Sequence, residues 1–159
     1  MRAFIAAAIA GALVSGAALA ANAPLVAPNG TPWLGVRAKA LDQLQTYDCG
    51  AAKCAPATPA ERAHPPLSDS EAQWIYQRGV YSGVAAHCGL DWRSRNYTPV
   101  MAHLQTTERK STRELALASG VHDIARDMAK AALGRVGACS PELKADMDRR
   151  LDFRPPSAR

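Results

Sequence analysis

The sequence predicts an all-α protein stapled by disulfide bonds, with a four-helix core, an additional N-terminal helix and a proline-rich loop. Two observations favour this class. Helix-start signals recur along the chain, and the apolar residues that follow them repeat with the spacing of a buried helical stripe. No stretch shows the alternation of apolar and polar residues that is typical of a β-strand.

The clearest helix begins after Ser68. Ser68 and Glu71 have the spacing of a capping box, in which each side chain hydrogen-bonds the backbone N–H of the other residue. Its buried stripe comprises Ala72, Ile75, Tyr76, Gly79, Val80, Gly83, Val84 and Cys88. Gly89 is a typical helix-ending glycine, so the pattern predicts a helix over residues 69–88.

Gly79 and Gly83 lie one turn apart on this stripe. Each costs about 1 kcal/mol relative to alanine in a helix interior, so a compensating interaction is expected. We interpret both as positions where another helix packs closely. Close approach of the backbone to a ligand is the alternative.

The segment before this helix contains one shorter helix and a loop. Thr31-Pro32 has the pattern of an N-cap followed by proline at the first helical position, and predicts a helix over residues 32–47. Residues 48–67 are expected to form a loop outside the core. Four prolines exclude regular structure there on this interpretation, namely Pro56, Pro59, Pro65 and Pro66.

Three more helices are expected after Gly89. Thr98-Pro99 repeats the cap pattern, Ser111 and Glu114 form a second capping box, and Ser140 precedes Pro141 at the start of the last helix. The predicted spans are 99–109, 112–134 and 141–151. Pro155-Pro156 ends regular structure.

The N-terminus has the features of a secretory signal peptide. Arg2 is a short positive region, Phe4 to Leu19 is almost continuously apolar, and Ala18-Leu19-Ala20 is a small-x-small cleavage site. We therefore predict that the mature protein begins at Ala21, has no transmembrane segment and is periplasmic or secreted. A retained membrane anchor is the alternative, although the run is short for spanning a bilayer.

These boundaries divide the chain into four parts. Residues 1–20 are the predicted signal peptide, and 21–67 are the N-terminal helix with its proline-rich arm. Residues 68–153 are the predicted helical core, and 154–159 a disordered tail. The formal net charge of +5 becomes +4 without Arg2, a mild positive balance that weakly favours anionic partners. The expected partner is an unknown protein or an envelope component. Nucleic acid is not expected to bind an exported protein.

The four cysteines predict two disulfides in an oxidising compartment. Among the three possible connectivities we predict Cys49–Cys54 and Cys88–Cys139. The first pair lies within one loop, and the second joins a helix end to the residue before a helix start, 51 residues later. Neither a C-x-x-C redox motif nor a haem attachment motif is present, and no cofactor is predicted.

Histidines and basic residues supply the weaker candidate sites. His87, His103 and His122 each lie on a predicted core helix, but no pair has the i, i+4 spacing of a helical metal site. Ordinary core or surface histidines are the favoured interpretation, so no catalytic or metal residue is predicted. A possible anion-binding patch at the ends of one helix comprises Arg93, Arg95, Arg109, Lys110 and Arg113. An ordinary solvated face is its favoured alternative.

The order of Cys88-Gly89, Trp92, Met101, a long helix and Cys139-Ser140 resembles small exported helical proteins of proteobacteria, most of which have no assigned function. The resemblance covers about residues 74–151. It implies a periplasmic helical domain with one long-range disulfide, and it carries no catalytic residue.

Together these features predict a periplasmic, non-enzymatic binding or accessory protein that acts through a helical surface. The alternative is a small metal-binding protein or enzyme that uses His87, His103 and His122. Convergence of these three imidazoles on one point would favour the alternative, whereas their dispersal would favour the first hypothesis.

Overall fold

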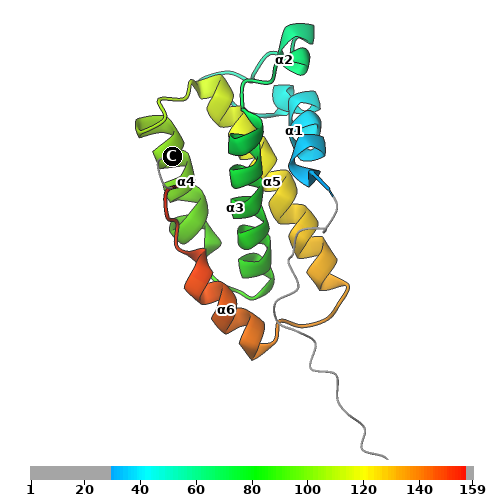
Figure 1. Cartoon of the computed structure of the whole chain (residues 1–159), viewed down its shortest axis with the longest axis vertical. Coiled ribbons are helices and arrows are strands. Elements are labelled where there is room, and N and C mark those ends of the chain that lie inside the picture. Colours follow the sequence, from blue (N-terminus) through cyan, green and yellow to red (C-terminus); the bar gives the residue numbers. More distant parts are fainter. Residues whose placement is uncertain (1–29, 157–159) are drawn as a thin grey trace, which may run out of the picture.

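The computed structural model describes residues 30–156, and this part of the chain is all-α (Figure 1). The predicted signal peptide lies outside it. The helices are α1 (Pro32–Asp42), α2 (Pro59–Ala63), α3 (Asp69–His87), α4 (Thr98–Thr106), α5 (Thr112–Gly134) and α6 (Pro141–Leu151). A 3₁₀ turn, η1, spans Leu44–Thr46 and a π-helical turn, η2, spans Arg93–Tyr97. The predicted fold class is confirmed, and among residues 30–156 no helix is long and apolar enough to cross a membrane.

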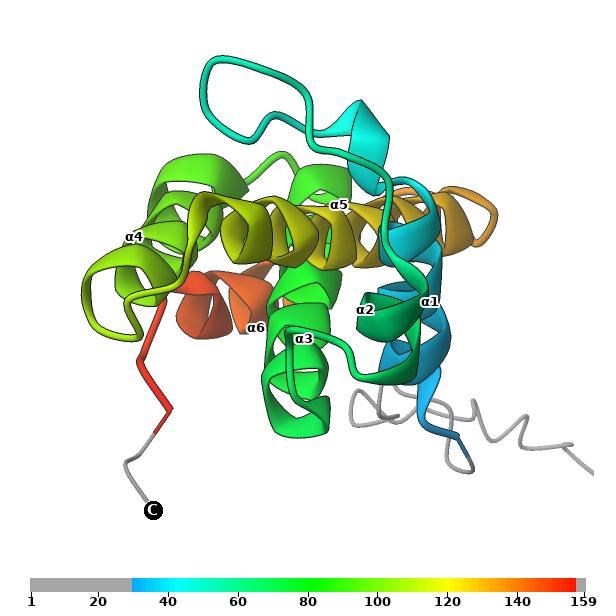
Figure 2. The ribbon, with the colours of Figure 1, turned by 90° about the horizontal axis from the view of Figure 1, so that it is seen from above.

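Helix α3 lies at the centre of the fold, with α5 packed along it (Figures 1 and 2). Helices α1 and α4 lie on opposite sides of α3, and α6 closes the end at which α3 stops (Figure 1). The capping box of α3 is present: Ser68 Oγ accepts a hydrogen bond from Glu71 N–H, and Glu71 Oε2 accepts one from Ser68 N–H. Gly89 has φ +67°, as expected for its helix-ending role.

The close packing predicted at the two α3 glycines is confirmed. A Cβ atom at Gly79 would lie 2.5 Å from the backbone oxygen of His122 and 2.7 Å from Ala125 Cβ. A Cβ atom at Gly83 would collide with the backbone oxygen of Arg126. The missing side chains therefore let α3 and α5 approach until backbone meets backbone.

The main core includes residues of the N-terminal helix, so the predicted division into a four-helix core and an additional helix is not confirmed. Val36, Ala40 and Leu44 from α1 and η1 are buried in the same cluster as residues of α3, α4 and α5. A second cluster joins the end of α3 to α6 through Val84, Cys88, Met147 and Leu151.

Both predicted disulfides are present. Cys88–Cys139 joins the end of α3 to the residue before the cap of α6, and Cys49–Cys54 closes the loop after η1. The Cys49–Cys54 loop is closer to the core than the sequence suggested, because Cys54 is only 4% exposed and belongs to the main cluster.

The prediction that residues 48–67 lack regular structure is wrong. Thr58 caps α2 with a complete capping box to Glu61, and Pro59 occupies the first helical position, where its missing N–H costs nothing. Arg113 on α5 holds this segment to the core by binding the Glu61 carboxylate and the carbonyl oxygens of Ala55 and Pro56.

Two helix ends also differ from prediction. The helix expected over residues 32–47 ends at Asp42, and the chain tightens into η1 before turning into the disulfide loop. The helix expected to end at residue 109 stops at Thr106, because Arg109 takes a left-handed conformation with φ +54° at the turn toward α5.

Candidate binding cleft

The three histidines have different neighbours in the structure. His122 is fully buried on α5 beside Ser82, and His103 on α4 lies beside Glu108. His87 is the last residue of α3. No group of three or more histidine, cysteine or acidic side chains in residues 30–156 is placed to hold a metal ion. The structure therefore does not bring the three candidate ligands to one position.

The five basic residues of the possible anion-binding patch serve different parts of the fold. Three of them pair with carboxylates of other elements: Arg95 with Asp148 and Asp152, Lys110 with Glu71, and Arg113 with Glu61. Arg93 lies over the Trp92 ring at 5.2 Å, and Arg109 is exposed at the turn after α4. Most of this positive charge is thus used within the molecule to join its elements.

A buried hydrogen-bond network lies where η2 meets α3 and α5. The amide of Asn96 donates to Ser82 Oγ (2.7 Å), and Ser82 Oγ lies 3.0 Å from His122 Nε2. On the other side of the ring, Nδ1 lies 3.4 Å from Asp123 Oδ1. A carboxylate only accepts hydrogen bonds, so this contact favours the tautomer with its proton on Nδ1, in which Nε2 accepts from the Ser82 hydroxyl.

This order of groups is that of a Ser-His-Asp hydrolase. Ser82 and His122 are nevertheless both 0% exposed, and the indole of Trp92 stacks over the imidazole with centroids 6.0 Å apart. A nucleophile needs access to its substrate, so the network in this structure acts as a polar element of the core.

The burial of His122 predicts a dependence of stability on pH. Burial disfavours the imidazolium and lowers the pKa of His122 below its ordinary value, although Asp123 acts in the opposite direction. As pH falls below about 6.5, the unfolded chain takes up a proton that the folded chain does not. The free energy of unfolding should therefore fall, by up to about 1.4 kcal/mol per pH unit from this residue.

Urea unfolding at pH 7, 6 and 5 measures this slope. His122→Asn should flatten this slope, because the buried titrating group is gone. A slope for His122→Asn equal to that of the wild type would show that His122 is not the group responsible.

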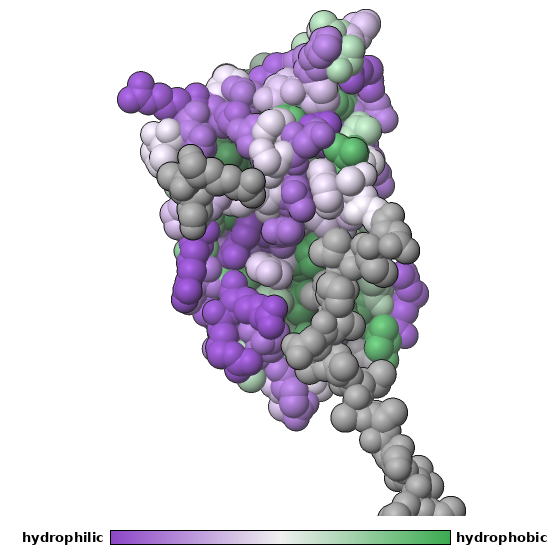
Figure 3. Space-filling view, viewed as in Figure 1, coloured by the Kyte–Doolittle hydropathy of each residue, from purple (hydrophilic) through white to green (hydrophobic). Residues whose placement is uncertain are grey.

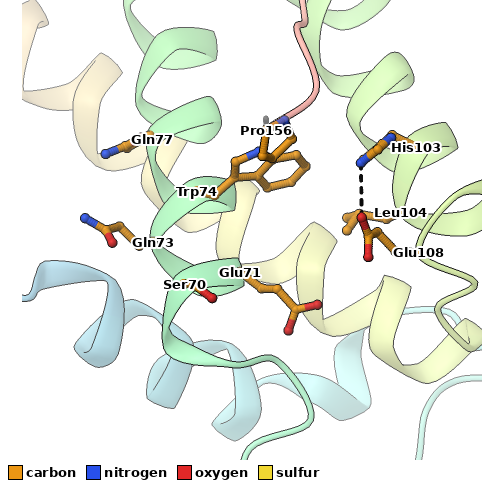
Figure 4. Close-up of a pocket in the computed structure, with 9 residues that line it drawn as sticks. All are labelled: Ser70, Glu71, Gln73, Trp74, Gln77, His103, Leu104, Glu108 and Pro156. Carbon is orange, nitrogen blue, oxygen red and sulfur yellow. Dashed lines mark ion pairs between the residues drawn. The ribbon is translucent and has the colours of Figure 1, made fainter. Parts of the chain in front are cut away.

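A cleft of about 490 Å³ opens between α3 and α4 (Figure 4). Its volume lies in the range of small-ligand sites. Trp74 points from α3 toward His103 and Glu108 on the other side, and Pro156 of the C-terminal segment lies beside the indole (Figure 4). The surrounding face is largely hydrophilic, with smaller apolar areas between the polar side chains (Figure 3).

The two aromatic rings that line the cleft from opposite sides, Trp74 on α3 and His103 on α4, both pack against Phe153 of the C-terminal segment. Trp74, His103 and Phe153 have ring centroids 5.5–6.2 Å apart, and Phe153 meets the indole edge-on at 89°. Trp74 is half-buried, so it both fills space between the helices and presents surface to the cleft. Such a ring offers a large, rigid contact area at low cost in conformational entropy.

The polar groups of the cleft differ in their freedom. Burial alone would raise the pKa of Glu71, but hydrogen bonds from Lys110 and Ser68 lower this pKa below its ordinary value. The Glu71 carboxylate is fixed in the capping box and in the Lys110 ion pair. Glu108 is half exposed and lies 3.4 Å from His103 Nε2. Glu108 is therefore the carboxylate that can turn toward a ligand.

Two other hollows carry fewer of these features. One of about 430 Å³ lies between the disulfide loop, α4 and α5, beside Tyr47 and Met101. A groove of about 250 Å³ between α3 and α5 is almost entirely apolar and includes the exposed side chains of Met128 and Val136. Only the α3–α4 cleft of these three combines a tryptophan wall with a histidine–glutamate pair.

Comparisons of the chain with models of protein families, with curated proteins and with solved structures found no match. The resemblance to small exported proteins of proteobacteria therefore stays a prediction. Sequence reasoning identified His103 but missed Trp74, Glu108 and Pro156. A large aromatic residue next to the apolar stripe of α3 was the available signal for Trp74, whereas nothing local places Pro156 beside it.

Proposed function

We propose that the protein is an exported, non-enzymatic binding or accessory protein of the periplasm, and that its partner binds in the α3–α4 cleft. The observation that carries this proposal is the partly exposed Trp74 in a cleft whose opposite side offers His103 and Glu108. Two disulfides, an apolar N-terminal run and a small-x-small site support the compartment.

Binding suits the cleft better than catalysis. The Ser82–His122 pair is ordered as in a hydrolase but is enclosed by the core, whereas the accessible groups are an aromatic wall and hydrogen-bonding side chains. Interfaces concentrate their affinity in residues of this kind, with tryptophan foremost. The alternative of a metal-binding protein or enzyme using His87, His103 and His122 lacks such support, because these side chains have different neighbours.

Photo-crosslinking in the producing cells tests this proposal. A benzoylphenylalanine at Gln77, an exposed residue that lines the cleft on α3, samples the cleft, and the same residue at Lys144 on α6 is an exposed control. We expect a defined crosslinked species from position 77 and none from position 144. Adding Trp74→Leu should remove the crosslink from position 77. Equal crosslinking from both positions, or from neither, would contradict binding through the cleft.

A further inference from the structure

We propose that the cleft binds an extended, proline-containing peptide, and that the chain's own segment Arg154-Pro155-Pro156 occupies one end of it as an internal competitor. This inference rests on the proposed binding function and names its ligand class. It starts from one observation: the residue that lines the cleft beside Trp74 is a proline from this chain's C-terminal segment.

The segment enters the cleft from a fixed point. After α6 ends at Leu151, the Arg95 side chain binds the Asp152 carboxylate (2.7 Å). The backbone oxygen of Arg95 accepts a hydrogen bond from the Phe153 N–H (3.0 Å). The Phe153 ring then packs against Trp74 and His103. Residue 153 is thus anchored, and Pro156 follows only three residues later.

The local sequence restricts the conformation of the segment. Proline fixes its own φ near −65°, and a residue that precedes proline is kept out of the helical region. Arg154 and Pro155 both precede a proline, so both favour the extended polyproline II conformation. In this conformation backbone carbonyl groups remain free to accept hydrogen bonds, and little entropy is lost on binding.

Aromatic grooves recognise such segments through ring-on-ring contact. The cleft offers the indole of Trp74 beside Pro156, and its space continues toward Leu104 and Glu108. A longer peptide would therefore find the proline position beside Trp74 and further room along α4. The internal segment covers only the first part of this path.

Tethering explains why a short segment can compete. Phe153 is anchored beside the cleft and only Arg154 and Pro155 separate it from Pro156, so the tether holds Pro156 at an effective concentration of roughly millimolar or more. Even a weak internal contact is then substantially populated. A peptide in solution must displace it. Removing the segment should therefore strengthen peptide binding by a factor of roughly three to ten, on the order of the ratio of effective concentration to a millimolar intrinsic affinity.

Fluorescence anisotropy with a fluorescein-labelled (Ala-Pro-Pro)₃ peptide tests the inference. The proteins are the full chain, a chain ending at Phe153, the double variant Pro155→Gly/Pro156→Gly, and Trp74→Leu, each checked for folding by circular dichroism. A (Gly-Ser)₄ peptide is the control ligand. We expect binding of the proline peptide alone, three- to tenfold tighter for the shortened chain and the double variant, and at least tenfold weaker for Trp74→Leu.

The outcomes separate the two levels of the argument. If the full and shortened chains bound the proline peptide with equal affinity, the proposal that the C-terminal segment competes for the cleft would be wrong. Failure of the shortened chain to bind the proline peptide would overturn the ligand class, and a persisting crosslink from position 77 would then leave the proposed binding function standing. Loss of that crosslink as well would refute the binding function itself.

Discussion

Replacing Gly83 with alanine is expected to destabilise the protein by about 1–3 kcal/mol or more, and Gly79→Ala by a similar amount. The added methyl group at either position meets the backbone of α5, at Arg126 or at His122. A flexible side chain could turn away, but a helix backbone cannot, so α3 and α5 must separate along the contact that organises the core. Urea unfolding followed by far-UV circular dichroism measures the loss.

Gly35→Ala is the matched control for these variants. Gly35 lies on α1, is exposed, and would have no atom within 4 Å of an added Cβ. There only helix propensity changes, which should stabilise the fold by up to about 1 kcal/mol. If Gly83→Ala proved as stable as Gly35→Ala, the two central helices would have to lie farther apart than the structure places them.

The second large effect is expected on loss of the long-range disulfide. Cys88→Ser/Cys139→Ser should lower the free energy of unfolding by roughly 4 kcal/mol, because the bond closes a loop of 51 residues. Cys88 is also 7% exposed within the cluster that holds α6, so the replacement removes packing as well as the constraint. Thermal melts under non-reducing conditions provide the comparison.

Cys49→Ser/Cys54→Ser is the corresponding control. Its loop has a sequence separation of only 5, for which the same chain-entropy argument gives roughly 2 kcal/mol. The loss should be clearly smaller than for the Cys88–Cys139 pair, although larger than for a bond wholly outside the core, since Cys54 is buried. Equal melting temperatures for the two double variants would show that loop length does not determine the stabilisation here.

Local signals explain what the sequence predicted well. The side chains of Ser68, Ser111 and Ser140 each accept a hydrogen bond from the backbone three residues on, and such caps depend only on neighbouring residues. The prediction for Pro59 is wrong because proline breaks a helix interior yet suits the first turn, and the Thr58–Glu61 spacing around it is that of a capping box.

The site was harder to predict because its groups meet only through tertiary structure. Trp74 and Pro156 lie far apart in the sequence, and no periodicity links them. The basic residues show the same limit. The residues next to Arg95 in the sequence predict an exposed charge. Only the packing of α6 shows that Asp148 and Asp152 neutralise this charge.

The covalent connections of the cleft are unequal at its two ends. The Cys88–Cys139 bond closes a ring that contains α4 and α5, while Trp74 and Pro156 lie outside this ring. The α3 and α4 walls are therefore joined covalently at the Cys88 end alone. At the other end the contacts are non-covalent: Leu104 of α4 packs in the main core, and Lys110, in the turn after α4, pairs with Glu71 at 2.6 Å. Because only non-covalent contacts join the walls there, any widening of the cleft would begin at the end where Trp74 and Glu108 face each other, and the walls would stay together near the disulfide.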